Sequence, residues 1–248
     1  MRILKIKTIT TALIIAILSS NTLPVFAANN KKLLGEYETI EKKYNFEDEV
    51  TTFSDLAVLS EVWKDFVKEN PNSTEAEQEA FLIQYVEENG VRPIFNQSAI
   101  TTYGVGDYIP GFSSLNDAER KLALQHPVQA VTVYDCSTKA TNATVSYYGI
   151  NGWQDNSDAF RHCTWNALMK KAMGTTAANT RATAHEAESS GIDKEMDLFN
   201  NSVGRSIAVS GKSDSEIYEA VKGKVSNGSC RRIVDGNLVA TDNTGLIK

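Results

Sequence analysis

Hydrophobic residues recur every three or four positions along most of this chain, which is the spacing of amphipathic helices. In the N-terminal part, this pattern predicts helices at about residues 31–43, 53–69 and 74–89. Pro71 separates the last two, and Ser73 or Thr74 with Glu77 forms a capping box for the third. No group of chemically active residues accompanies these helices, so we interpret residues 31–89 as a helical N-terminal extension.

The helical periodicity stops at residues 90–114, a stretch rich in Gly, Pro and aromatic residues. We interpret this stretch as a linker or covering loop that precedes a second helical domain at residues 115–248. In that domain, helices are predicted at about residues 115–126, 128–143, 155–171, 176–189, 193–207 and 213–225. Gly174 is expected to end the third of them, and Asp193 to cap the fifth.

Two short runs near the C-terminus, Arg-Arg-Ile-Val at 231–234 and Asn-Leu-Val-Ala-Thr at 237–241, flank the dipeptide Asp235-Gly236. Asp-Gly suits the two-residue type I′ turn, so these runs predict a β-hairpin. The predicted fold is therefore mainly α, a multi-helix domain with a small C-terminal β-hairpin, preceded by the helical extension.

Residues 1–27 have the three parts of a secretory signal peptide. Three basic residues come first, an apolar run follows at 11–18, and a small-residue cleavage site stands at 25–27. The apolar run is short for a spanning helix, which makes a retained membrane anchor the weaker alternative. We expect a secreted protein, extracellular or associated with the cell wall, with no transmembrane segment after signal removal.

The chain is acidic, with 25 Lys and Arg against 31 Asp and Glu and a formal net charge of −6. The signal segment contains three of the basic residues and no acidic ones, so its removal changes the net charge to −9. An acidic surface argues against nucleic acid as an electrostatically attracted partner.

Three cysteines are too few for a disulfide scaffold, and an odd number leaves one unpaired in a single chain. We expect Cys136 to pair with Cys230, because Cys163 falls on the apolar face of a predicted helix and resembles a small buried hydrophobic residue. A nucleophilic Cys163 beside His162 is the alternative. Adjacent helical residues point in different directions, so that dyad has poor geometry.

Groups that transfer protons, bind anions or ligate metals concentrate in residues 151–205. They occur in three strings on three predicted helices: Asp-Ala-Phe-Arg-His at 158–162, Ala-His-Glu at 184–186, and Met-Asp-Leu-Phe-Asn-Asn at 196–201 with Gly-Arg at 204–205. The helices carry polar stripes that converge if they pack together. The candidate catalytic residues are His162, His185, Glu186 and Asp197, and the candidate substrate-binding residues are Arg161, Asn166, Asn201 and Arg205.

These strings, with His-Pro at 126–127, Asn-Gly at 151–152 and Trp-Asn-Ala at 165–167, resemble a bacterial domain family of unknown function. That family is found in secreted, wall-associated and toxin-like proteins. The resemblance covers about the C-terminal half and leaves residues 31–114 outside it. It implies a bacterial secreted context and supports the existence of a site, but implies no particular reaction.

Three hypotheses account for the strings. In the first, a divalent metal is held by His162, His185 and a carboxylate from Glu186 or Asp197, and its bound water attacks a substrate bond. In the second, no metal is needed, and one histidine acts as general base or nucleophile while arginines hold an anionic group. In the third, the polar stripes only fix helix packing in a secreted or wall-associated binding module.

We expect a hydrolase of an ester or phosphodiester, because Arg161 and Arg205 favour an anionic substrate such as a phospholipid, a nucleotide or a cell-wall phosphodiester. The cofactor is then either absent or a divalent metal on His162, His185 and Asp197. This expectation requires the imidazoles of His162 and His185 to meet in one cleft that water reaches.

Overall fold

The computed structural model describes residues 44–91 and 114–248, and Tyr44–Lys248 group into one compact unit. The expected signal segment, the expected helix at 31–43 and nearly all of the expected linker lie outside the described residues. The helices and the hairpin predicted elsewhere can be compared with the structure directly.

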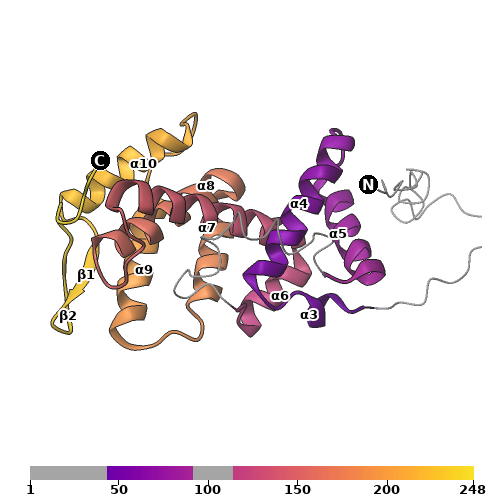
Figure 1. Ribbon diagram of the computed structural model, residues 1–248, viewed down its shortest axis with the longest axis horizontal. Helices are drawn as coiled ribbons and strands as arrows, with labels where there is room; N and C mark the ends of the chain where they lie inside the picture. The colour runs from indigo at the N-terminus through magenta and orange to yellow at the C-terminus, as the bar shows by residue number, and fades with distance from the viewer. Residues whose placement is uncertain (1–43, 92–113) are drawn as a thin grey trace, which may run out of the picture. The chain divides into compact units, whose positions relative to one another are not determined.

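The described residues contain eight α-helices and one two-stranded antiparallel sheet, as the mainly helical prediction requires (Figure 1). The elements are α3 (Phe46–Glu49), α4 (Phe53–Glu69), α5 (Glu75–Asn89), α6 (Asp117–Gln125), α7 (Pro127–Tyr148), α8 (Asn156–His185), α9 (Gly191–Ser206), α10 (Asp214–Ser226), β1 (Arg231–Val234) and β2 (Asn237–Ala240).

Short polar residues start most of these helices. Capping boxes, in which a side chain accepts from the third helical N–H and the third residue accepts in return, begin α4, α5, α6 and α10. Helix α9 differs from expectation: its N-cap is Ser190, and Asp193 lies in the first turn instead of capping it. Helix α7 continues beyond the predicted end at residue 143 until Gly149, whose φ of 72° ends it in the left-handed conformation.

Gly174 breaks α8 as the sequence predicts, with φ 86° and ψ 167° inside an otherwise helical run. The segment before the break packs against α7, α9 and α10 and is buried on nearly every side. Its polar residues therefore lie inside the molecule, which is unusual for helical residues of this type.

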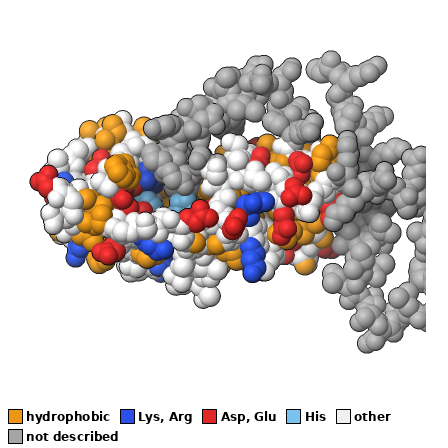
Figure 2. All heavy atoms as spheres, turned by 90° about the horizontal axis from the view of Figure 1, so that it is seen from below, with side chains coloured by type: hydrophobic (Ala, Val, Ile, Leu, Met, Phe, Trp, Pro, Cys, Tyr) orange, Lys and Arg blue, Asp and Glu red, His pale blue; other side chains and the backbone are white. Residues whose placement is uncertain are grey.

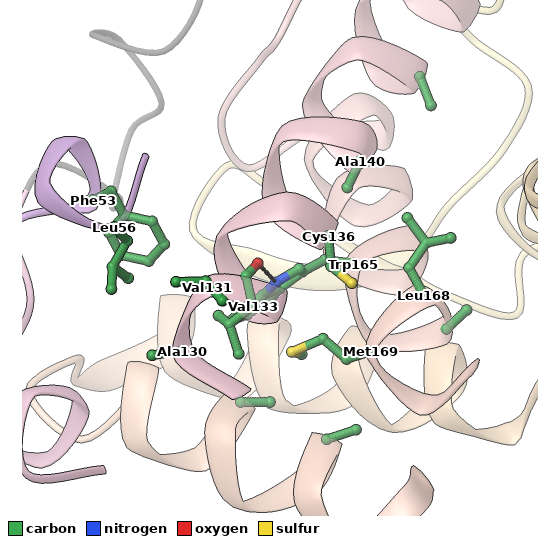
Figure 3. Packing of buried hydrophobic residues seen from close by; sticks show 14 of the residues in the cluster. Phe53, Leu56, Ala130, Val131, Val133, Cys136, Ala140, Trp165, Leu168 and Met169 are labelled. Carbon is green, nitrogen blue, oxygen red and sulfur yellow. Dashed lines mark hydrogen bonds between the residues drawn. The ribbon is translucent and has the colours of Figure 1, made fainter. Parts of the chain in front are cut away.

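The hydrophobic core joins the N-terminal helices to the C-terminal ones. Figure 3 shows Val131 and Val133 of α7 near Trp165 of α8, whose indole N–H donates to the carbonyl of Val133 at 3.3 Å. Phe53 and Leu56 of α4 belong to the same cluster of buried residues. Helices α4 and α7 share an apolar interface as a result.

The hairpin has the predicted turn and lies beside α9 (Figure 1). Asp235 and Gly236 have φ of 50° and 74°, as a type I′ turn requires. The Asn200 side chain acts like a neighbouring strand: its Oδ1 accepts from the N–H of Arg231 and its Nδ2 donates to the same residue's carbonyl, both at 2.9 Å. Helix α9 is thereby attached to the start of β1.

Candidate functional site

Three side chains from α8 and α9 form what we term the imidazole–carboxylate cluster: Asp158, His162 and Asp197. Asp155 caps α8, which places Asp158 in its first turn and His162 one turn later on the same face. The Nε2 atom of His162 lies 3.4 Å from Asp158 Oδ1 and 3.3 Å from Asp197 Oδ1. The side chains of Asp158 and His162 are buried, whereas that of Asp197 is 16% exposed, so solvent reaches the cluster from the Asp197 side.

A chain of hydrogen bonds determines which nitrogen of His162 carries hydrogen. An Arg205 Nη1 group donates to Asn166 Oδ1 at 2.6 Å, and an arginine can only donate. Asn166 must then present its Nδ2, which donates to Asn201 Oδ1 at 2.6 Å. That oxygen, an acceptor, lies 3.3 Å from His162 Nδ1, which must therefore be the protonated nitrogen.

In the neutral ring, the direction of these hydrogen bonds also fixes the protonation of Nε2, the other ring nitrogen of His162. With the hydrogen on Nδ1, neutral His162 directs its Nε2 lone pair at the two carboxylates. Three acceptor atoms from three side chains thus face one point. Such an arrangement needs positive charge beside it. The Arg161 guanidinium, bonded to Asp158 Oδ1 and 3.5 Å from Nε2, supplies one charge, and a proton on Nε2 or a bound cation would supply another.

The pKa values of Asp158, His162 and Asp197 depend on one another. Burial raises the pKa of Asp197 to about 6, and the charges of Glu186 and Asp158 add to this, although His162 opposes it. Burial would lower the pKa of His162, but the carboxylates of Asp197 and Asp158 outweigh it and raise the value to about 9. For Asp158, burial is outweighed by the hydrogen bond with His162 and the charge of Arg161, so its pKa is lowered.

Glu186 supplies a third carboxylate near the cluster. It is the C-cap of α8 and only 2% exposed, and its Oε1 has no hydrogen-bond partner among the described residues. Its charge contributes to the raised pKa of Asp197, as expected for neighbouring carboxylates. A buried carboxylate oxygen without a donor is costly, and this one belongs to a residue close enough for its charge to act on Asp197.

Arg161 holds the cluster in place from within. Its guanidinium donates to Asp158 Oδ1 and, through Nη1, to Asn151 Oδ1 at 2.7 Å and the Gly152 carbonyl at 3.3 Å. The residue is 3% exposed. The sequence suggested that Arg161 binds substrate. In the structure its two terminal nitrogens donate to protein groups, and its Nε has no hydrogen-bond partner among the described residues.

Asn166 and Asn201, the other polar residues expected to contact substrate, are fully buried. Their place in the hydrogen-bond chain makes them groups that orient His162. Arg205 is partly exposed at the far end of that chain, and burial lowers its pKa. Of the four predicted substrate-binding residues, Arg205 has the position that best suits contact with an anion.

The expected meeting of the two imidazoles does not occur. His185 lies at the other end of α8, where its Nδ1 is 2.7 Å from Glu119 Oε1 and its ring packs edge-on against Trp165 and Phe53. Asn116 Nδ2 donates to the carbonyls of Ala184 and His185 at 2.8 and 3.2 Å. The break at Gly174 separates the helical segment that carries His185 from the one that carries His162, so His185 joins α8 to the start of α6.

The possible metal ligands that the structure brings together differ from the set expected from sequence. In the described part of the chain, the one group of histidine, cysteine and acidic residues with ligand atoms close enough for a metal ion is Asp158, His162 and Asp197, all within 4.8 Å of one another. Asp158 takes the place expected for His185. The sequence could have indicated Asp158 as a ligand, because Asp158 and His162 are four residues apart on a helix.

The expected pairing of Cys136 with Cys230 is wrong. The Cys230 sulfur lies 3.3 Å from that of Cys163, and all three cysteines are buried and free. Cys163 is buried in the helix, as predicted, and also donates to the Asn200 carbonyl. The sequence did not show that the start of β1 returns to this turn of α8.

On the face shown in Figure 2, acidic side chains are spread over the described residues, and a small area of histidine is visible between basic and acidic groups. Among the helices in residues 44–91 and 114–248, none has the length and apolar character needed to span a membrane.

Comparison with known proteins finds a match to one family model, whose description gives no reaction. Residues 120–229 match the model of a family described as a domain of unknown function (DUF6973). The match runs from within α6 to just before β1, so it includes the whole imidazole–carboxylate cluster. No curated protein and no solved structure matches the chain.

Proposed function

We propose that this protein is a secreted bacterial hydrolase that cleaves an ester or phosphodiester bond in an anionic substrate at the imidazole–carboxylate cluster. The observation that carries the proposal is the convergence of His162 Nε2 and two carboxylate oxygens on one point, with access from the side of Asp197. Buried titratable groups that shift one another's pKa are typical of catalytic sites.

The cluster would activate a water molecule for attack. The water oxygen forms a bond to the acyl carbon or phosphorus, and the bond to the leaving oxygen breaks. One water proton passes to a carboxylate, for which the unpartnered Oε1 of Glu186 is the available acceptor, and is returned to the leaving oxygen. Arg205, partly exposed and about two helical turns beyond Asp197 on α9, would bind an anionic group of the substrate away from the bond that breaks.

Other residues would act by positioning. Arg161 holds Asp158, and Asn166 with Asn201 fixes the ring of His162. The proposed reaction therefore needs one imidazole and not the two that the sequence suggested, because Asp158 stands beside His162 where His185 was expected. His185, bonded to Glu119, contributes to stability instead of chemistry. The secreted context rests on the signal-like pattern of residues 1–27 and on the resemblance to wall-associated and toxin-like proteins.

The test uses small chromogenic substrates, p-nitrophenyl esters and bis(p-nitrophenyl) phosphate, with and without EDTA. Asp197→Asn should lower kcat by about 10²–10⁴-fold, because it removes the carboxylate at the entrance. Glu195→Gln is the matched control: it removes one negative charge from an exposed position on the same helix and should leave kcat unchanged. Equal kcat for Asp197→Asn and wild type would overturn the proposal.

A second candidate is a non-catalytic module in which the polar groups fix the packing of α8 against α9. The low exposure of His162 and the full burial of Asn166 and Asn201 favour it. In that case Asp197→Asn changes only the stability, and wild type hydrolyses none of the substrates faster than the buffer does.

A further inference from the structure

The surroundings of His162 contain more buried negative than positive charge. Asp158, Asp197 and Glu186 contribute three carboxylates, whereas Arg161 contributes one permanent positive charge. Arg161 donates to Asp158 and is occupied on its other side by Asn151. Because unpaired buried charge is strongly unfavourable, a further positive charge would stabilise this region.

The groups around the cluster are arranged as they are in metal sites. A ligating histidine commonly donates its second N–H to an oxygen that fixes the ring, and His162 Nδ1 faces Asn201 Oδ1 at 3.3 Å. Ligating carboxylates are also hydrogen-bonded, and Asp158 Oδ2 accepts from the N–H of Gln154 at 2.6 Å. Asp197 Oδ1, in contrast, has no hydrogen-bond donor among the described residues.

From this arrangement we propose that Asp158, His162 and Asp197 bind one divalent cation of the first transition row, through Oδ1, Nε2 and Oδ1. One imidazole and two carboxylates suit Mn²⁺, Fe²⁺ or Zn²⁺, whereas Ca²⁺ takes six to eight oxygen ligands. Three protein ligands leave positions for water. The unpartnered Oε1 of Glu186 is the oxygen that would accept a hydrogen bond from such a water.

Arg161 is the competing cation. One of its Nη2 hydrogens is bonded to Asp158 Oδ1, and Nη2 lies 3.5 Å from His162 Nε2. An entering metal ion would share Asp158 Oδ1 with this guanidinium and displace it from the ring nitrogen. The bonds from Arg161 Nη1 to Asn151 and Gly152 would keep the side chain in place.

The test is isothermal titration of Mn²⁺ into the full chain after dialysis against a chelator, without substrate. We expect one saturable site, at least roughly 100-fold weaker in Asp197→Asn, because loss of a ligand exceeds the effect of losing an outer-shell partner. Affinity should be unchanged in Glu195→Gln. Absence of saturable binding in wild type, or equal affinity in Asp197→Asn, would overturn the proposal.

The cation's role in hydrolysis rests on the proposed function, but its binding does not. Hydrolysis that persists in EDTA in a chain that binds no Mn²⁺ would overturn the metal site alone. Saturable Mn²⁺ binding without hydrolysis of any substrate would overturn the proposed function alone. Circular dichroism of Asp197→Asn checks its fold, and if that variant unfolds, the wild-type titration decides.

A second inference comes from the two thiols that face each other between α8 and β1. Cys163 and Cys230 are fully buried, with their sulfurs 3.3 Å apart. We infer that they form an intrachain disulfide when the protein folds under oxidising conditions. Each thiol loses a proton and the pair gives up two electrons to the disulfide of an oxidoreductase or of oxidised glutathione, which is reduced to two thiols.

This bond would hold the elements of the candidate site together. Cys163 follows His162, and Cys230 precedes the residue that Asn200 of α9 binds through both backbone groups. Burial raises the pKa of the Cys163 thiol, and in the folded protein neither sulfur is exposed. Oxidation therefore belongs to folding, before the core closes.

The chain is unfolded with reductant and refolded with oxidised and reduced glutathione, and its peptides are mapped by mass spectrometry without reduction. We expect a peptide that joins Cys163 to Cys230, also in Cys136→Ser, and a thermal midpoint about 5–15 °C above that of the reduced protein. A Cys136–Cys230 peptide, or three alkylatable thiols in the refolded wild type, would overturn the inference.

Discussion

The proposed catalysis and the proposed cation binding at the imidazole–carboxylate cluster both depend on the orientation of one side chain, the imidazole ring of His162. Neither histidine nor asparagine has a fixed donor direction by itself, but Arg205 does, and its hydrogen bond to Asn166 propagates through Asn201 to His162. Arg205, which is partly exposed, thereby determines that Nδ1 carries the hydrogen. In neutral His162 the nitrogen with the lone pair is then Nε2, which faces Asp158 and Asp197.

Replacement of Asn201 tests this orientation. Asn201→Leu removes the acceptor for His162 Nδ1 at nearly constant volume and should weaken Mn²⁺ binding by about 10–100-fold. Asn201→Asp keeps that acceptor and replaces Nδ2, which has no partner in the described part of the chain, by a second carboxylate oxygen. The negative charge that it adds favours a cation, so this variant should bind Mn²⁺ at least as well as wild type. Titration calorimetry provides the comparison, and an Asn201→Leu affinity equal to wild type would contradict the assigned role.

His185 has a different role, which a substitution separates from that of His162. His185→Leu leaves the partly buried Glu119 carboxylate without the partner 2.7 Å away and should lower the free energy of unfolding by about 1–3 kcal/mol. Denaturant unfolding measures the loss, and Mn²⁺ affinity should not change. A loss of Mn²⁺ binding in this variant would restore the two-histidine metal site that the sequence suggested.

At the scale of elements, the cluster exists because α8 and α9 approach closely at Gly204. A Cβ at Gly204 would lie 2.3 Å from the Cys163 carbonyl oxygen and 2.9 Å from Asn166 Cβ. A helix with any larger residue there would have to move away from α8. Asp197 would then move away from His162 as well.

Gly204→Ala should therefore destabilise the protein by about 1–3 kcal/mol, because the backbone oxygen it meets cannot move freely. Gly223, in the interior of α10, is the matched control, since a Cβ there meets nothing within 4 Å. Gly223→Ala should stabilise by about 0.5–1 kcal/mol through the better helix propensity of alanine. Both values come from chemical unfolding curves, and the same sign for the two variants would contradict the close packing of α8 and α9.

Most of the helices and the hairpin could be predicted from sequence. Periodicity and capping residues predicted the described helices except the four-residue α3, and also the break at Gly174 and the hairpin turn, because each of these depends on neighbours within a few residues. The tertiary contacts of each polar side chain could not be predicted from sequence. Gly174 puts His162 and His185 on separate segments of α8, but their partners, Asp197 for His162 and Glu119 for His185, come from other helices that the local pattern does not identify.

At the scale of the whole molecule, the core joins helices from both sides of the segment at 92–113. Leu59 of α4 and Val131 of α7 are completely buried members of one cluster, and Ser60 Oγ donates to Asp135 Oδ1 of α7 at 2.7 Å. The helices that the sequence suggested as an extension thus pack on the helix that also supports α8.

Leu59→Ala tests this shared core. The cavity should cost about 2–5 kcal/mol of unfolding free energy, and it should lower the protection of slowly exchanging amides in α8 as well as in α4. Hydrogen exchange followed by mass spectrometry resolves the two helices. Lower protection limited to α4 and α5 would show that these helices unfold independently.

The most direct test of the central claim uses the three histidines of the chain as reporters. In a two-dimensional ¹⁵N–¹H NMR spectrum of the histidine rings, each ring gives its own signals, and paramagnetic Mn²⁺ broadens those closest to it. We predict that increasing amounts of substoichiometric Mn²⁺ remove the His162 signals first, and those of His126 and His185 only at higher concentrations. Persistence of the His162 signals, or their equal loss with those of His185, would contradict a site formed by Asp158, His162 and Asp197.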